Sequence, residues 1–106
     1  MRPLLLLTQH TGYVSDLNER AERRQSAFHR AVAREWEAIA AHERAAAFHD
    51  STADVLAQAA LGELDAVRSA GMARRAANER RLAETARERA QTARARLAAE
   101  GVTVEE

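Results

Sequence analysis

Cysteine and lysine are both missing from this chain of 106 residues. The lack of cysteine excludes disulfide bonds, thiol catalysis and thiolate metal sites, and it leaves the redox compartment open. All sixteen of its Lys+Arg residues are therefore arginine, and about a quarter of the chain is alanine. Arginine without lysine, together with abundant alanine, is typical of a high-GC genome, so we expect a high-GC bacterium or its phage as the source.

Residues that break helices are also scarce. The chain has one proline and four glycines, and neither residue type occurs between Gly12 and Gly62. Long stretches without proline or glycine favour helices, above all where alanine is abundant. We therefore expect an all-α fold, either an elongated helical hairpin or a three-helix bundle, with alanine-rich seams.

Long hydrophobic runs and net charge are absent as well. The longest purely aliphatic run near the start is Leu4 to Leu7, and the formal net charge is zero. Four residues fall far short of the roughly 20 that span a bilayer, and no small-residue cleavage site follows them. We expect a cytoplasmic protein without a membrane span, in which residues 1–13 form an apolar lead-in arm. This arm would cover the end of the helical domain or, as the alternative, bind a partner as a strand.

The first expected helix covers residues 16–49. Asp16 and Glu19 have the spacing of a capping box at its start. At 100° per residue one apolar stripe follows along this helix, with Trp36 on its flank. The stripe consists of Leu17, Ala21, Phe28, Val32, Ile39 and Ala46.

The apolar face then moves round the helix, which predicts a break near His49 and Asp50. Ser51 followed by Asp54 is a reasonable N-terminal cap, so we expect a second helix over residues 52–69. One long helix that changes partner halfway is the alternative. The second face consists of Phe48, Val55, Leu56, Ala59, Ala60, Leu64 and Val67.

The last expected helix covers residues 72–99, between Gly71 and Gly101, and it completes a helical domain of residues 14–100. Gly62 is the alternative position for the turn before it. An acidic tail of residues 101–106 follows. The apolar stripe of the last helix is mostly alanine: Met72, Ala76, Leu82, Ala83, Ala86, Ala90, Ala93 and Leu97.

Large apolar side chains are few for a helical domain of this length, and a small core stabilises a single chain weakly. We therefore expect a homo-oligomer, and in addition a protein partner. The residues expected at these interfaces are Phe28, Val32, Trp36, Ile39, Phe48, Val55, Leu56, Leu64, Val67, Leu82 and Leu97.

The last helix carries most of the positive charge, with eight arginines against three glutamates between Met72 and Ala99. Arginine suits carboxylate and phosphate groups. We expect a solvated helix whose arginines pair with acids such as Glu100, Glu105 and Glu106, and a negatively charged protein partner is the alternative. Nucleic acid is the less favoured alternative, because no aromatic side chain is interleaved for base stacking. The candidate residues are Arg74, Arg75, Arg80, Arg81 and Arg87.

Glu35, His42 and His49 are weak candidates for a metal site. They share one helix face, but they are seven residues apart, whereas chelation from one helix needs residues three or four apart. The Glu-x-x-His pattern of di-iron bundles is absent. We expect polar seam residues and no cofactor, and a metal-binding bundle remains the second alternative.

Sequence patterns of catalysis are missing too, since the chain contains no glycine-rich phosphate loop and no nucleophile elbow. So small a helical core rarely encloses a substrate pocket. The sequence therefore favours a non-enzymatic helical module for protein–protein interaction and oligomerisation.

Overall fold

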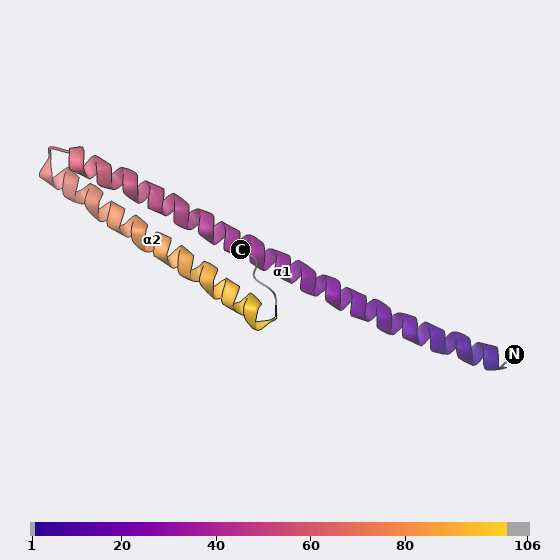
Figure 1. Cartoon of the computed structure of the whole chain (residues 1–106). Helices are drawn as coiled ribbons and strands as arrows, with labels where there is room; N and C mark the ends of the chain where they lie inside the picture. Colours follow the sequence, from indigo (N-terminus) through magenta and orange to yellow (C-terminus); the bar gives the residue numbers. More distant parts are fainter. Residues whose placement is uncertain (1, 102–106) are drawn as a thin grey trace. The chain divides into compact units, whose positions relative to one another are not determined.

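The computed structural model describes the backbone of residues 2–101 and the side chains of residues 14–101. Helix α1 covers Arg2–Gly62 and helix α2 covers Ala66–Ala99. The chain divides into two units, Met1–Arg34 and Glu35–Glu106. In the second unit α2 runs back along the last part of α1, so the two form an antiparallel hairpin (Figure 1). The expected all-α hairpin is confirmed.

The alternative three-helix bundle is wrong. Residues 2–101 form two helices, and α1 continues through His49 and Asp50 without a break. Ser51 and Asp54 therefore lie inside a helix and cap nothing. Alanine has the highest helix propensity and is abundant on both sides of this point, so one cap-like pair of residues does not end the helix.

Helix α1 also begins earlier than predicted, at Arg2 and not near Asp16. Pro3 is compatible with this start, because the first turn of a helix has no intrahelical N–H bond to lose. Asp16 and Glu19 consequently lie in mid-helix and form no capping box. The expected roles of the side chains in residues 1–13, and the acidic residues after Gly101, lie outside the described part of the chain.

The turn between the helices is at Gly62, the position that the sequence left as the alternative. Asp65 is the N-cap of α2: its backbone is extended, and its carboxylate accepts a hydrogen bond of 2.9 Å from the backbone N–H of Arg68. One residue further on, the Ser69 hydroxyl donates a bond of 2.8 Å to the carbonyl oxygen of Ala60, which ties the start of α2 to the end of α1. The expected boundary at Ser69 to Gly71 is therefore wrong.

At its other end α2 finishes as predicted. Gly101 follows the helix with a φ of +82°, the left-handed conformation that glycine adopts without strain. Gly71, by contrast, lies inside α2 and has no positive φ. Of these two glycines, Gly101 alone ends a helix.

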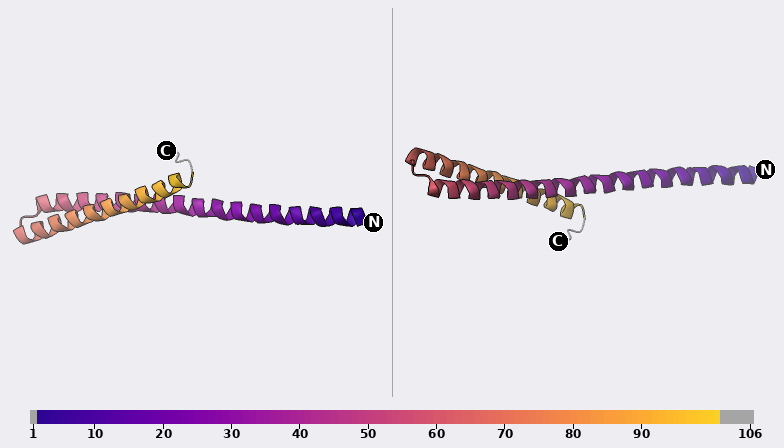
Figure 2. Two further views of the ribbon diagram at one scale, coloured as in Figure 1. Left: turned by 90° about the horizontal axis from the view of Figure 1, so that it is seen from below. Right: turned by 90° about the horizontal axis from the view of Figure 1, so that it is seen from above.

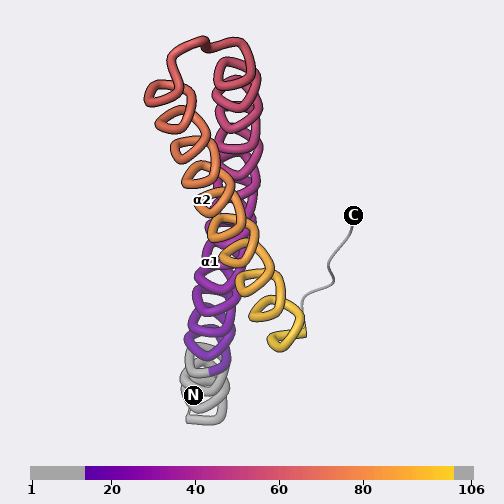
Figure 3. The backbone as a smooth tube through the Cα atoms, turned by 90° about the vertical axis from the view of Figure 1, so that its left-hand side faces the viewer, coloured from indigo at the N-terminus to yellow at the C-terminus, as the bar shows by residue number. Residues whose placement is uncertain are grey.

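The buried residues of the hairpin repeat every seven positions. On α1 they are Ile39, Ala46, Ala53 and Ala60, and on α2 they are Ala76, Ala83, Ala90 and Leu97, with a second column of Ala86 and Ala93. A repeat of seven is slightly shorter than two turns of an α-helix, so two such helices wrap around each other in a left-handed coiled coil. Accordingly α2 crosses the last part of α1 obliquely (Figure 2, Figure 3).

Alanine forms this seam. Of the ten hydrophobic residues that are buried between Val14 and Gly101, eight are alanine and the other two are Ile39 and Leu97. At the middle of the seam Ala46 packs against Ala83 and Ala86. A methyl group lets two helix axes approach closely but buries little area. Of the predicted second apolar face Ala60 is buried in the seam, whereas its large members Phe48, Val55, Leu64 and Val67 are exposed.

Within the described residues no helix has a stretch apolar enough, over a sufficient length, to cross a membrane.

Candidate interaction surfaces

One flank of the seam is held by ion pairs between the two helices. Arg87 Nη1 lies 2.6 Å from Asp50 Oδ2, and Arg94 pairs with Glu43 one heptad further along. Arg80 Nη2 lies 3.7 Å from the carboxylate of Asp54. These residues define the paired side of the hairpin: Glu43, Asp50 and Asp54 on α1, and Arg80, Arg87 and Arg94 on α2.

A polar layer interrupts the alanine seam near its centre. His49 Nδ1 lies 2.5 Å from Glu79 Oε2, and the two side chains are 26% and 23% exposed. Both residues occupy seam positions, since His49 is three residues after Ala46 and Glu79 three after Ala76. A polar pair at such a position favours this alignment of the two helices, because a slip by one heptad would place His49 opposite Ala86 or Met72 and break the contact.

The opposite flank of the seam carries more arginines than acids, since Glu35 and Glu88 are the acids that line its groove beside Arg89 and Arg96. On α2 it carries the column Arg68, Arg75, Leu82, Arg89 and Arg96, each one residue before a seam position. The facing positions on α1 are Ala38, Ala45, Thr52 and Ala59. In the part of the chain whose side chains are described, no salt bridge involves Arg68, Arg75, Arg89 or Arg96.

Two large apolar residues of α1 lie next to this arginine column. Phe48 and Val55 are each five residues after a paired-side acid, which places them roughly 140° round the helix from it. They are 66% and 69% exposed, and Leu82 in the arginine column is 42% exposed. We call this flank the arginine side, defined by Arg68, Arg75, Leu82, Arg89 and Arg96 of α2 with Phe48 and Val55 of α1.

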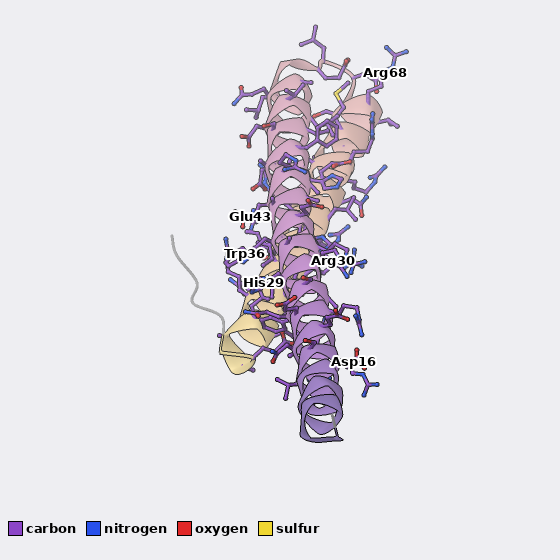
Figure 4. All side chains as sticks on the ribbon, turned by 90° about the vertical axis from the view of Figure 1, so that its right-hand side faces the viewer. Asp16, His29, Arg30, Trp36, Glu43 and Arg68 are labelled. Atoms are coloured by element: carbon purple, nitrogen blue, oxygen red, sulfur yellow. The ribbon has the colours of Figure 1, made fainter. Side chains whose placement is uncertain are left out.

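Side-chain positions support this division into two sides. Glu43 and Trp36 project from the same side of α1 (Figure 4). Arg89 and Arg96 line one groove together with Ala38 of α1, and the groove has a volume of about 470 Å³. Trp36 and Arg94 line a different groove together with Glu43. Each flank thus combines residues from both helices.

Other large apolar side chains are exposed outside these two sides. At the turn of the hairpin Leu61, Leu64 and Val67 are between 79% and 100% exposed. In the first unit Val14, Leu17 and Phe28 are between 42% and 46% exposed. We call these two sets the turn set and the first-unit set.

The predicted interface residues fall into three groups. Ile39 and Leu97 are buried in the seam of the hairpin, so they are not available to a partner. Val32, Trp36 and Leu56 are half-buried. The remaining six are exposed: Phe28, Phe48, Val55, Leu64, Val67 and Leu82.

The predicted anionic-partner residues separate in the same way. Arg80 and Arg87 belong to the paired side, where acids of α1 already neutralise them. Arg75 lies on the arginine side, and Arg74 and Arg81 are exposed residues near it in sequence. Sequence reasoning missed Arg68, Arg89 and Arg96. Their spacing in multiples of seven from Arg75 was the signal that could have found them.

The spacing of the weak metal candidates follows from the heptad repeat of the seam. Glu35, His42 and His49 are seven residues apart because they share the second seam column of α1. His49 is engaged by Glu79, whereas Glu35 and His42 line the groove next to Arg89. No group of three or more histidine, aspartate or glutamate side chains that could hold a metal ion occurs among the described residues.

Comparison of the whole chain with protein-family models, with curated proteins and with solved structures finds no match.

Proposed function

We propose that this chain is a non-enzymatic helical module that self-associates and binds other proteins. One observation carries the proposal: the seam of the hairpin takes alanine, while nine large apolar side chains between Val14 and Leu82 are 42–100% exposed. Covering such side chains is favourable by about 25 cal/mol per Å² of apolar surface. Association with other chains is the means by which they can be covered.

The turn set and the first-unit set are the surfaces we assign to self-association. Both project large aliphatic or aromatic side chains, and neither lies on the arginine side. The described residues of the first unit also lack a core of their own, because every side chain from Val14 to Ala31 is exposed. A helix without a buried face gains stability chiefly by packing against a partner.

Light scattering of the full chain tests this proposal. We expect a mass above that of one chain at micromolar concentration, falling on dilution. Replacing the residues of either the first-unit set or the turn set by serine should raise the protein concentration at which the oligomer dissociates. Serine at three exposed positions away from both sets, Ala33, Ala41 and Ala77, provides the matched control. A single-chain mass at every concentration would show that self-association is wrong.

Nucleic-acid binding is a second candidate, favoured by the nine arginines against three glutamates in α2. The ion pairs of the paired side weaken it, because three of those arginines already face acids of α1. Retardation of duplex DNA in a gel, lost as the salt concentration rises, would support it.

A further inference from the structure

The arginine side differs from the paired side in a way that points to a missing partner. Both flanks of α2 carry arginine at heptad spacing, but the acids of α1 that form ion pairs with α2 arginines, Glu43, Asp50 and Asp54, lie on the paired side. The facing column of α1 on the arginine side is alanine and threonine, and among the described side chains none of the four guanidinium groups of this side forms an ion pair with a carboxylate. Arginine is the side chain best suited to a carboxylate in such a setting, because it can form two parallel hydrogen bonds.

Exposed apolar residues lie along the same flank. In the antiparallel register set by the Arg87–Asp50 and Arg94–Glu43 pairs, Leu82 lies at the level of the segment between Phe48 and Val55. The surface therefore has an apolar centre with arginines on both sides of it along α2. Such a combination matches an amphipathic helix, whose apolar stripe is bordered by charged residues.

The spacing also fits a helix. Successive positions of the column are seven residues apart, which is about 10.5 Å along the axis, and Leu82 separates the arginine pair Arg68 and Arg75 from the pair Arg89 and Arg96. A third helix packed alongside in the same heptad period would bring a carboxylate to each of these arginines. We infer that the arginine side is the docking surface for an acidic amphipathic α-helix of another protein. This inference rests on the proposed function as an interaction module.

A second copy of the chain fits this surface less well. The acids of the hairpin at positions 43, 50, 54 and 79 are already engaged within the chain. Between Val14 and Arg34 the first unit has three acids against five arginines. The other acids of the hairpin, apart from the N-cap Asp65, are Glu35, Glu37, Glu63, Glu84, Glu88 and Glu100, and no two of them are seven residues apart. Within residues 14–101 the chain therefore offers no unpaired acidic column at heptad spacing.

Nucleic acid fits less well too. Phosphates would leave Phe48, Val55 and Leu82 uncovered. Glu35 and Glu88 line the same groove as Arg89 and Arg96, and they would repel a phosphate backbone there. A partner helix can carry uncharged side chains opposite Glu35 and Glu88, whereas a nucleic-acid backbone carries a phosphate at every step.

Binding of a synthetic helix to the full chain tests the inference. The probe is a fluorescently labelled peptide of four heptads, with leucine along one stripe and glutamate on its borders. The control peptide has lysine in place of every glutamate. The arginine-side variant is Arg68→Gln, Arg75→Gln, Arg89→Gln and Arg96→Gln. Its charge-matched control is Arg20→Gln, Arg24→Gln, Arg30→Gln and Arg34→Gln, made in exposed positions of the first unit.

We expect the acidic peptide to bind the natural chain and the lysine peptide not to bind. Affinity for the acidic peptide should fall about tenfold or more in the arginine-side variant, and stay close to the natural value in the control. Phe48→Gln, at an exposed position that leaves the seam intact, should also weaken binding several-fold. Helical circular dichroism checks that every variant is folded.

Several outcomes would overturn the inference. Among them are no binding of the acidic peptide, or an equal loss of affinity in the two charge-matched variants. Tighter binding of a duplex DNA of similar length, lost in the arginine-side variant, would assign the surface to nucleic acid. A fall to single-chain mass in Phe48→Gln would assign it to a second copy. If the chain is an oligomer by light scattering but does not bind the acidic peptide, the docking surface is rejected and the proposed self-association is not.

Discussion

Single methyl groups set the distance between α1 and α2. Ala83 has no exposed surface, and it packs with Ala46 and Ala86 at the centre of the seam. Close-packed interiors do not absorb extra methylene groups without shifting the elements on either side. Each alanine of the seam is thus a steric limit on side-chain size more than a source of buried area.

Replacing Ala83 with leucine should lower the free energy of unfolding by about 1–3 kcal/mol, because the larger side chain pushes the helices apart. Urea unfolding followed by circular dichroism, at one fixed protein concentration, measures the change. Ala77→Leu, at an exposed position of the same helix, should stay within about 0.5 kcal/mol of the natural chain. Equal effects of the two substitutions would contradict the alanine seam.

A second prediction at the scale of residues concerns the contact between His49 and Glu79. A double-mutant cycle with His49→Ala and Glu79→Ala should give a coupling energy of about 1 kcal/mol, because the contact is short and three-quarters covered. The same cycle on Arg80 and Asp54, a longer and more exposed pair, should give less than about 0.5 kcal/mol. Coupling energies in the reverse order would show that the His49 contact does not align the seam.

At the scale of the element, the two ends of α2 are built differently. Its first turn depends on the carboxylate of Asp65, and its last turn on the left-handed backbone of Gly101. Long alanine-rich segments have no strong preference for one starting residue. Cap residues therefore decide where the helix begins and ends.

Replacing Asp65 with alanine should cost about 1 kcal/mol of unfolding free energy, because the backbone N–H of Arg68 loses its acceptor. Asp65→Asn keeps an acceptor oxygen and should recover most of this stability. Chemical denaturation at fixed protein concentration compares the three chains. A loss in the asparagine variant as large as in the alanine variant would argue against the cap.

Gly71 provides a test of the helix boundary itself. Because Gly71 lies inside α2 with nothing closer than 4.0 Å to an added Cβ, Gly71→Ala should raise the free energy of unfolding by about 1 kcal/mol. Gly101→Ala should instead be destabilising or fray the end of α2, since its φ is positive. Thermal melts of both variants measure these shifts. A destabilised Gly71→Ala would restore the boundary that the sequence predicted there.

At the scale of the molecule, the core belongs to one unit. Among residues 14–101, all ten buried hydrophobic side chains lie between Ile39 and Leu97, within Glu35–Glu106. Stability of the hairpin should therefore depend little on the first unit, whose described side chains are almost all exposed.

A chain that begins at Glu35 should unfold cooperatively at a urea concentration close to that of the full chain. Both chains are measured at the same protein concentration, low enough that any oligomer has dissociated. A chain that ends at Ala90 loses Ala93 and Leu97 from the seam and should unfold at clearly lower urea. Loss of structure in the first of these two chains would show that residues 1–34 contribute to the core.

The sequence predicted part of this architecture from particular residues. The apolar stripe expected in the last helix contains all six buried residues of α2, from Ala76 to Leu97. The expected break at His49 is wrong, because the buried face of α1 continues from Ile39 through Ala46, Ala53 and Ala60 and does not follow the large side chains. Phe48 and Val55 marked a real face of α1, but one that lies outside the seam.

By itself, the sequence determined that the chain is helical, because helix propensity and the scarcity of proline and glycine act locally and need no partner. The tertiary structure decided which face of α1 is covered and which arginines are neutralised. Those outcomes depend on the close approach of two alanine columns and on the antiparallel register, both of which arise only when residues far apart in the chain pack against each other.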